Sequence, residues 1–234
     1  MKITIVIPTY NEEKELPFLL ESIKKNNTQK DYEIIIADAH SQDNTRKIAK
    51  KYDCKIVDGG LPAKGRNQGA QYATGDLIYF IDADSILPQD YLENTSEEFL
   101  SKNLSIAITR MQANSDKNTY KILHNISNIL TELISKFKAH GAGCYGIITT
   151  PSIHHKLEGF NQDLDFGEDT DYIERAAKLG RFGVLKSSKI IVSVRRLEED
   201  GLLTLIKQYG KSTINDIRGK RTKAEDIEYG FNHK

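Results

Sequence analysis

Short apolar runs and helical patterns alternate through roughly the first hundred residues of the chain. The apolar runs predict strands over residues 3–7, 32–37, 54–57 and 77–81. Between them, apolar residues at spacings of three and four predict helices, the first after Asn11 and the others over 42–52 and 66–73. Strands separated by helices predict right-handed crossovers and an α/β fold with a mostly parallel sheet flanked by helices.

The second half of the chain has less regular patterns. They predict strands over 104–108, 145–149 and 189–194, and helices over 120–137, 171–179 and 202–209. In the helix over 120–137, the apolar residues step by three and four: Leu123, Ile126, Leu130, Leu133 and Phe137. Two heptads are too few for a coiled coil, so we expect this stripe to pack on the core, with a dimer seam as the alternative. No long linker divides the chain, and we expect a single domain over 1–234.

Two aspartates follow the strand predicted over 77–81. Asp82 and Asp84 are two residues apart, so in extended backbone their side chains point to one face. Ligands of parallel α/β sheets bind beyond the carboxyl ends of the strands, where Thr9 and Asp38 also fall. Carboxylate oxygens suit Mg²⁺ or Mn²⁺, which keep positions for water and substrate phosphates. The alternative is that Asp84 or Ser85 caps a helix that begins near 87–88.

Composition narrows the class of protein. Lys and Arg together number 33, and Asp and Glu together also number 33, so the formal net charge is zero and we expect no nucleic-acid partner. Cys54 and Cys144 lack the spacing of a zinc site or a disulfide framework, which favours a reducing compartment. The first apolar run stops at Pro8, too short for a signal peptide, and no stretch approaches a membrane span. We therefore expect a cytoplasmic protein, at most peripheral at the inner membrane face.

Four segments, in order, carry a family resemblance. They are residues 6–12 (Val-Ile-Pro-Thr-Tyr-Asn-Glu), 37–45 (Ala-Asp-Ala-His-Ser-Gln-Asp-Asn-Thr), 64–84, which ends in Asp82-Ala83-Asp84, and 159–175, which contains Gly-Glu-Asp-Thr-Asp over 167–171. Together they span roughly residues 3–180 and resemble an inverting family-2 glycosyltransferase of the GT-A fold. The second segment departs from that family's pattern, because Ala39-His40 replaces a pair of small residues.

The resemblance implies an enzyme that transfers a sugar from a UDP- or GDP-linked donor to an acceptor hydroxyl with inversion, assisted by a divalent metal. It assigns about 1–110 to the donor and about 111–234 to the acceptor, with an amphipathic helix at the carboxyl end. The donor residues it implies are Pro8, Thr9, Tyr10, Glu12, Asp38, Arg66 and Asp82, and the metal ligands are Asp84 and Asp82. The chain has no Trp, so it lacks the Gln-x-x-Arg-Trp motif of processive synthases, and we expect a single transfer.

Three of the candidate binding sites have an alternative role. Asp38 resembles the family's base-reading carboxylate, which only accepts hydrogen bonds and so favours uracil or guanine over cytosine; the alternative is a helix cap. Arg66 is expected on the nucleotide or its phosphates, with a surface cation as the alternative. Arg195 and Arg196 are candidates for a diphosphate contact or for an exposed basic pair.

The acceptor side depends on the Glu-Asp pair. In the resembled family the Asp of this pair removes the proton of the acceptor hydroxyl, which assigns the general base to Asp169. Glu168 and Gly143 are expected to border the acceptor site. Acidic residues here also complement a helix dipole, and Asp171 with Glu174 has the spacing of a capping box.

Two other functions stay open: transfer to a polyprenyl phosphate, whose anionic acceptor needs no base, and binding of a nucleotide sugar without catalysis. The motifs hold the nucleotide, so they do not specify the sugar, or whether the acceptor is a glycan or lipid-linked. The apolar stripe and cations over 202–221 resemble an interfacial helix that makes peripheral contact with an anionic membrane. The alternative is that this stripe packs on the sheet or on a second subunit of a homodimer.

Overall fold

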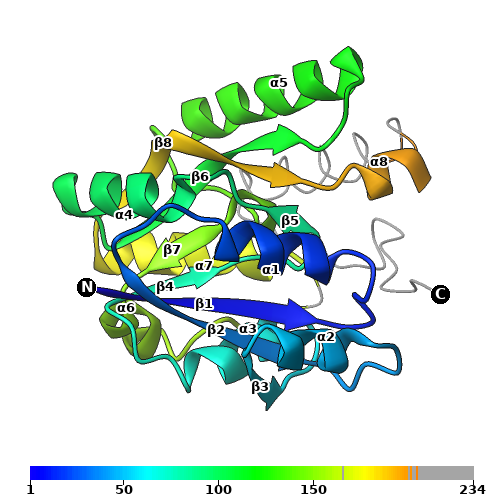
Figure 1. Ribbon diagram of the computed structural model, residues 1–234. Coiled ribbons are helices and arrows are strands. Elements are labelled where there is room, and N and C mark those ends of the chain that lie inside the picture. The colour runs from blue at the N-terminus through cyan, green and yellow to red at the C-terminus, as the bar shows by residue number, and fades with distance from the viewer. Residues whose placement is uncertain (165, 200, 202–203, 205–234) are drawn as a thin grey trace.

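The computed structural model describes residues 1–164, 166–199, 201 and 204. Within them lies one mixed sheet with helices on both of its faces (Figure 1). The strands are β1 (Lys2–Thr9), β2 (Asp31–Asp38), β3 (Lys55–Asp58), β4 (Leu77–Phe80), β5 (Ser85–Ile86), β6 (Ile106–Ala113), β7 (Ile147–Thr149) and β8 (Phe182–Val192), in the spatial order β3-β2-β1-β4-β7-β6-β8-β5. Apart from Thr204, the helix predicted over 202–209 and the membrane contact over 202–221 lie outside the described residues.

The half of the sheet from β3 to β4 is parallel, as the alternation of strands and helices predicted. β1 pairs in parallel with β2 and β4, and β2 with β3. The other half is mixed, because β7 runs antiparallel to both β4 and β6, while β6 and β8 are parallel. β4 and β6 therefore point the same way, and their carboxyl ends lie at one edge of the sheet.

Two layers of helices cover the sheet. They are α1 (Leu16–Lys24), α2 (Thr45–Lys51) and α4 (Tyr91–Ser101) on one face, and α3 (Pro62–Ala70), α6 (Pro151–Lys156) and α7 (Glu168–Leu179) on the other. Ile3, Ile5 and Ile7 of β1 pack in the first core, while Val6 packs in the second. β1 is thus buried on both faces, which explains why the sequence from Ile3 to Ile7 is apolar except at Thr4.

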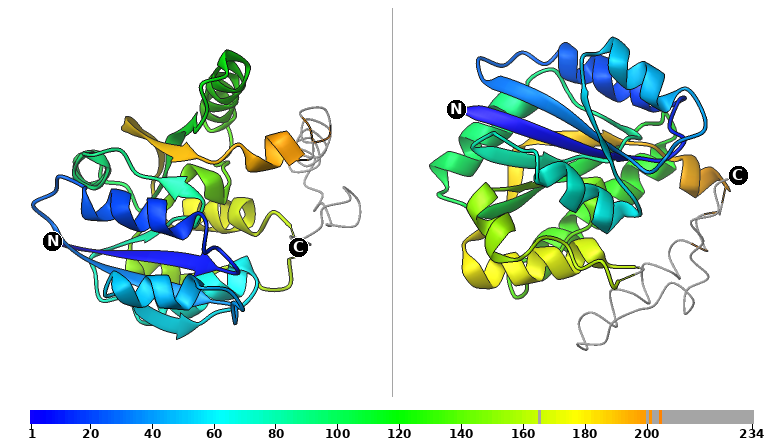
Figure 2. Two further views of the ribbon diagram at one scale, coloured as in Figure 1. Left: turned by 45° about the vertical axis from the view of Figure 1, so that its right-hand side comes forward. Right: turned by 90° about the horizontal axis from the view of Figure 1, so that it is seen from below.

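Helix α5 (Asn118–Ile134) corrects an expectation. It lies at the end of the molecule beyond β6 and β8 (Figure 2), and the short helices η1 (Gly143–Tyr145) and α8 (Arg195–Glu199) complete the described fold. The stripe predicted to pack on the core is largely exposed: Ile126, Leu130 and Leu133 are 48–53% exposed, and Phe137 is 92% exposed. The prediction that this stripe packs on the core was wrong, because periodicity shows that a helix has an apolar side but not which side faces the protein.

The segment after β4 also differs from the alternative interpretation of Asp84 and Ser85. Ser85 begins the two-residue strand β5, which pairs antiparallel with β8. The next helix, α4, begins only at Tyr91, with Asp90 at its N-cap position. Neither Asp84 nor Ser85 therefore caps a helix: Asp84 lies on the turn after β4, and Ser85 is the first residue of β5.

Candidate functional site

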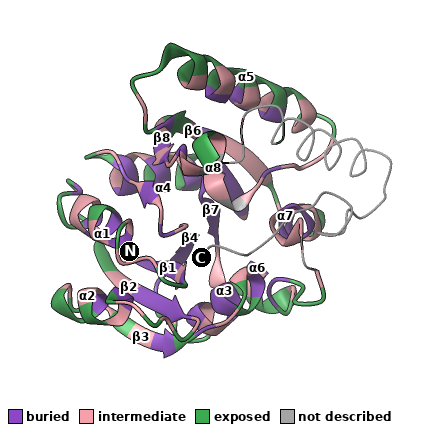
Figure 3. Ribbon diagram, turned by 90° about the vertical axis from the view of Figure 1, so that its right-hand side faces the viewer, coloured by how far each residue is buried: buried purple, intermediate pink, exposed green. Residues whose placement is uncertain are grey.

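The polar residues predicted to converge do lie at one edge of the sheet. Thr9 ends β1, Asp38 ends β2, and Asp82 follows β4, which are adjacent strands in the order β2-β1-β4. Figure 3 looks onto this edge. Pro8 is half-buried, and Tyr10 is 53% exposed in the loop after β1.

Arg66 joins the two halves of the site. Its side chain is only 4% exposed and forms ion pairs with Asp82 (Nη2–Oδ1, 2.9 Å), Glu168 (Nη1–Oε1, 3.0 Å) and Asp169 (Nη1–Oδ1, 2.8 Å). Burial by itself lowers the pKa of the guanidinium, but the three carboxylates outweigh it and raise the pKa, so Arg66 stays charged. The interpretation of Arg66 as a surface cation was therefore wrong; its contact with a nucleotide stays a prediction.

Close packing of α3 on β1 places Arg66. Gly65 and Gly69 are four residues apart and lie on one face of α3. A Cβ added to Gly69 would overlap Cγ1 of Val6, and one added to Gly65 would lie 3.2 Å from Cβ of Pro8. The two glycines let the helix backbone approach the strand, so Arg66 reaches the carboxyl end of β4.

Glu12, which the family resemblance assigned to donor binding, is a carboxylate in an unusual electrostatic environment. Burial and then the nearby charge of Asp84 raise its pKa from 4.5 to about 7, while Arg195 opposes that increase. Its Oε2 atom is buried without a hydrogen-bond partner within the described residues. Glu12 therefore faces the Asp82-Ala83-Asp84 segment, which its position in the sequence, about seventy residues away, did not reveal.

Arg195 is brought to the same place by the end of β8. The backbone N–H of Ser193 donates to the carbonyl oxygen of Asp84 (3.2 Å), and Arg195 begins α8 two residues later. Its Nε is buried and has no hydrogen-bond partner in the described part of the chain, so the interpretation of Arg195 as an exposed cation was wrong. The side chain of Arg196 lies outside the described residues.

Buried polar atoms without hydrogen bonds gather around this edge. Within the described residues they include Glu12 Oε2, Arg66 Nε, Ser85 Oγ and Arg195 Nε. Buried polar groups in native proteins are nearly always paired, so such a cluster indicates a polar ligand that supplies the missing partners. Donors from Arg66 and Arg195 and an acceptor from Glu12 suit a ligand that carries both anionic oxygens and a cation.

The residues also fit a divalent cation. No group of three or more His, Cys, Asp or Glu side chains in the described residues has the geometry of a complete metal site. Mg²⁺ and Mn²⁺ need no such cage, because one or two carboxylates together with substrate phosphates suffice. Asp82 and Asp84 provide these hard oxygen donors, and the unpaired oxygen of Glu12 lies in the field of the same charges.

Asp38 is fully buried and already has partners. Its Oδ1 accepts from the backbone N–H of Ser41 (3.1 Å) and from Nη1 of Arg46 (3.0 Å), and its Oδ2 accepts from the hydroxyls of Thr9 (3.0 Å) and Ser41 (2.6 Å). A nucleobase contact with Asp38, which stays a prediction, requires Ser41 or Arg46 to give up a bond. Asp38 holds the loop before α2, and Asn44 rather than Asp38 is the N-cap residue of that helix.

The first turn of α7 carries the Glu-Asp pair. Gly167, in a left-handed conformation (φ 77°), is the N-cap residue, and Glu168 and Asp169 follow it at the positive end of the helix dipole. Asp171 does not cap the helix: it is 2% exposed and pairs with Arg175 (2.7 Å). The hydroxyl of Thr170 donates to the carbonyl of Gly141 (2.8 Å), so this turn is tied to the segment that leads to Gly143 in η1.

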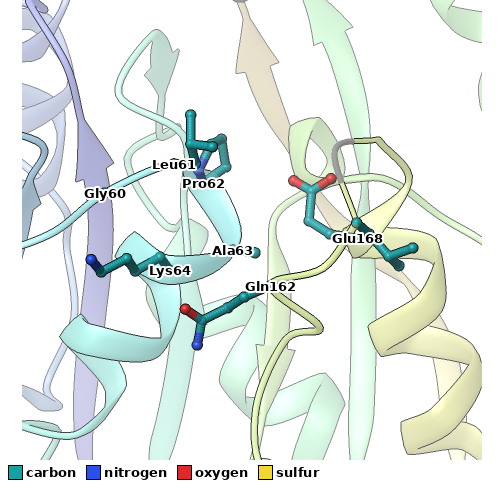
Figure 4. A pocket seen from close by; sticks show the side chains of 8 residues that line it. Gly60, Leu61, Pro62, Ala63, Lys64, Gln162 and Glu168 are labelled. Atoms are coloured by element: carbon teal, nitrogen blue, oxygen red, sulfur yellow. The ribbon is translucent and has the colours of Figure 1, made fainter. Parts of the chain in front are cut away.

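A pocket opens beside these residues. It has a volume of about 320 Å³ and lies between the beginning of α3 and the segment before α7 (Figure 4). The lining residues are Gly60, Leu61, Pro62, Ala63, Lys64, Gln162, Leu164 and Glu168. Asn67 fixes its wall, because its side-chain amide accepts from the N–H of Phe160 (2.7 Å) and donates to the carbonyl of Phe160 (2.8 Å). Glu168 belongs both to this pocket and to the Arg66 cluster.

Sequence comparisons give this geometry a context. Residues 4–163 match the family profile described as "Glycosyl transferase family 2". Poly(ribitol-phosphate) beta-N-acetylglucosaminyltransferase TarS of Staphylococcus aureus is 28% identical over 121 residues, which are 48% of this chain and 21% of TarS. Undecaprenyl-phosphate 4-deoxy-4-formamido-L-arabinose transferase of Proteus mirabilis is 30% identical over 176 residues, 69% of this chain and 52% of that protein. The chain thus spans about a fifth of the one relative and about half of the other.

Solved structures confirm the expected fold class. TarS residues 1–349 in complex with UDP-GlcNAc align with a TM-score of 0.68 at 19% identity, covering 82% of this chain and 58% of that one. Mannosyltransferase PcManGT from Pyrobaculum calidifontis, in complex with GDP-Man and Mn²⁺, aligns with a TM-score of 0.65 at 19% identity, covering 82% of this chain and 56% of that one. The α/β fold with a large mixed sheet is therefore shared with these GT-A proteins.

Proposed function

The chain belongs to glycosyl transferase family 2, and on that premise we propose that it transfers one sugar from a UDP- or GDP-linked donor to an acceptor hydroxyl, with inversion, in a single metal-assisted displacement. The observation that carries this proposal is the Arg66 cluster. Arg66 holds Asp82 from the end of β4 and Asp169 from the start of α7 on one guanidinium. A carboxylate suited to the donor side thus lies next to one suited to the acceptor side.

Each residue has a separate task in the proposed reaction. Asp169 takes the proton of the acceptor hydroxyl. At the same time the oxygen of that hydroxyl bonds to the anomeric carbon of the donor sugar, and the bond from this carbon to the diphosphate breaks. A sugar hydroxyl is a poor nucleophile until its proton is withdrawn, which is why a base is needed. Arg66 positions Asp169 through an ion pair of 2.8 Å.

The leaving group determines the tasks on the donor side. Asp84 and Asp82 would hold a divalent cation, which supplies charge stabilisation for the departing nucleoside diphosphate. Arg195, with its buried and unpaired Nε, is suited to donate to a diphosphate oxygen. TarS is solved in complex with UDP-GlcNAc and PcManGT in complex with GDP-Man and Mn²⁺, which supports a nucleotide-sugar donor for this chain.

A polyprenyl phosphate is the second candidate acceptor. The Proteus mirabilis relative, named as a transferase for undecaprenyl phosphate, covers 69% of this chain. A phosphate oxygen is already anionic and does not need a base. The two acceptors therefore differ in whether turnover depends on Asp169.

The test separates donor binding from transfer. Calorimetry with UDP and GDP, with Mn²⁺ or with a chelator, measures binding, and release of nucleoside diphosphate from a panel of UDP- and GDP-sugars with simple glycosides measures transfer. We expect Asp169→Asn to keep metal-dependent binding and to lose turnover by about 10²–10⁴-fold. Asp163→Asn, which changes an exposed carboxylate in the preceding loop, is the matched control and should behave like the native chain.

The outcomes are distinct. Native turnover by Asp169→Asn on a glycoside removes Asp169 from the mechanism. Native turnover of that variant only on a polyprenyl phosphate supports the second acceptor. Nucleotide binding without turnover of any nucleotide sugar in the native chain contradicts an enzymatic function.

A further inference from the structure

Helix α5 presents its apolar side to solvent. We call this surface the α5 apolar face; it consists of Ile122, Ile126, Ile129, Leu130, Leu133 and, just beyond the helix, Phe137. Each of the six side chains is between 48% and 92% exposed. Figure 3 shows the exposed side of α5 turned away from the sheet. A contiguous apolar surface of this kind indicates a site of contact with a partner or a membrane.

The opposite side of α5 is polar and faces the protein. His124, Asn128 and Thr131 are 5–6% exposed. The side chain of Asn128 accepts from the N–H of Met111 (3.0 Å) and donates to its carbonyl (2.9 Å). The hydroxyls of Ser127 and Thr131 lie 2.7 and 2.9 Å from the hydroxyl of Tyr145.

These hydrogen bonds fix the rotation of the helix. Rolling α5 to bury its apolar face would break the bonds of Asn128 to Met111 and move Ser127 and Thr131 away from Tyr145. A surface helix of a globular protein normally turns its apolar stripe inward. The inverted orientation of α5 is therefore built into the fold, and the apolar face is available to another surface.

The margins of the α5 apolar face are cationic. Residues 116–138 contain four lysines and two carboxylates, those of Asp116 and Glu132. Lys117 pairs with Glu198 (2.9 Å) and Lys138 with Glu174 (2.7 Å), which leaves Lys121 and Lys136 as the cations of these margins. Glu132 is 19% exposed and is occupied by ion pairs with Arg110 (2.6 Å) and Lys186 (2.9 Å). Lys121 and Lys136, near the two ends of the face, are exposed.

The exposed lysines indicate which kind of surface covers the α5 apolar face. A second copy packed antiparallel about Ile129 would bring Lys121 of one helix beside Lys136 of the other, and a parallel copy would bring each lysine beside itself. The segment over 202–221 carries five cations and one carboxylate, so it too would meet like charge. An anionic surface complements the lysines, and an extended lipid surface also covers the length of the face.

We propose that the α5 apolar face rests on a lipid surface that contains anionic headgroups, with the helix axis in the plane of the interface. The isoleucines, leucines and Phe137 enter the boundary between headgroups and acyl chains, while Lys121 and Lys136 contact phosphate or carboxylate groups of the headgroups. The aromatic ring of Phe137 at one end serves as an anchor of the kind that interfacial helices use.

Sedimentation of the full chain with vesicles tests this proposal. Vesicles of phosphatidylcholine alone are compared with vesicles that also contain phosphatidylserine, at low and high salt. We expect binding to the phosphatidylserine vesicles that decreases with salt, because screening weakens the lysine contacts. A chain with Ile126→Gln, Leu130→Gln and Phe137→Ser should bind roughly 100-fold more weakly, and one with Lys121→Gln and Lys136→Gln roughly 25-fold more weakly.

Phe18→Ser is the matched control, because Phe18 on α1 is 61% exposed but does not belong to the α5 apolar face. It should bind vesicles like the native chain. Circular dichroism of each variant verifies that the changed residues, all exposed, leave the fold intact. The proposal is overturned if the native chain stays in the supernatant, or if the triple variant sediments as the native chain does. It is also overturned if sedimentation velocity shows a dimer that the triple variant lacks, without vesicle binding, because a second copy then covers the face.

Discussion

Replacing Glu12 by Gln is expected to stabilise the nucleotide-free protein at neutral and alkaline pH, although Glu12 belongs to the proposed donor site. Burial and the charge of Asp84 raise the pKa of Glu12 from 4.5 to about 7. Below the lower value, the carboxyl is protonated in both the folded and the unfolded chain, so it does not change stability. Between the two values, the unfolded chain releases the proton while the folded chain keeps it, so the free energy of unfolding falls as pH rises.

The size of the effect follows from this interval. A difference of about 2.5 pH units (7 − 4.5) at 1.36 kcal/mol per unit corresponds to about 3 kcal/mol above pH 7. Glutamine keeps the shape of the side chain but does not ionise, so Glu12→Gln removes this penalty. The structure therefore predicts that the variant and the native chain differ little near the lower pKa value and differ by about 3 kcal/mol at alkaline pH.

Urea unfolding in the presence of a chelator, at about pH 5 and about pH 8, measures the two free energies. Glu97→Gln, which removes a carboxylate that is 65% exposed, is the control and should change neither value appreciably. Added Mn²⁺ should reduce the difference in free energy of unfolding between Glu12→Gln and the native chain, since a cation offsets the charge of the carboxylates. The reasoning is refuted if Glu12→Gln gives the same difference from the native chain at both pH values, or destabilises the chain at pH 8.

Three further changes test other parts of the site. Arg66→Met is expected to lower the free energy of unfolding, measured with urea, by about 3–5 kcal/mol, because it leaves three carboxylates without their buried cation. Lys25→Met, which breaks an exposed ion pair, is the control and should lower it little; equal decreases would contradict the role of burial. Gly69→Ala should cost about 1–3 kcal/mol, because the new methyl group overlaps Val6, and an unchanged melting temperature would show that α3 moves away freely. Asp84→Asn should abolish the dependence of UDP or GDP affinity on Mn²⁺ in calorimetry; equal affinity with and without metal in the native chain would remove the metal from the mechanism.

The parts of the fold that were predicted depend on local signals. β1 and β4 are buried on both faces, so they appear in the sequence as apolar runs, interrupted in β1 only by Thr4, that end near polar residues. The strand β5 has only two residues and exists because β8 lies beside it, which no local pattern records. The periodicity of α5 predicted the helix, but its buried side is determined by hydrogen bonds of Asn128 and Tyr145 to distant partners.

The same distinction applies to the candidate site. Asp82 and Asp84 could be selected because both belong to one short motif at the end of one strand. The role of Arg66 could not, because its partners Glu168 and Asp169 lie about a hundred residues away and burial reverses the usual expectation for an arginine. The raised pKa of Glu12 could not be predicted either, because it arises from burial and from charges that only the folded chain brings near it.

The side chain of Asn128 has a consequence for the solubility of the protein. β7 pairs with β6 through Ile106, Ala107 and Ile108, and beyond that point no strand among the described residues adjoins β6 on this side. The amide of Asn128 occupies the N–H and the carbonyl of Met111 there, as an adjacent strand would. An open stretch of strand is a template for pairing with another chain and for aggregation. Helix α5 thus closes a gap in the sheet with a side chain, and unfolding of this helix alone would expose an edge on which molecules can add to one another.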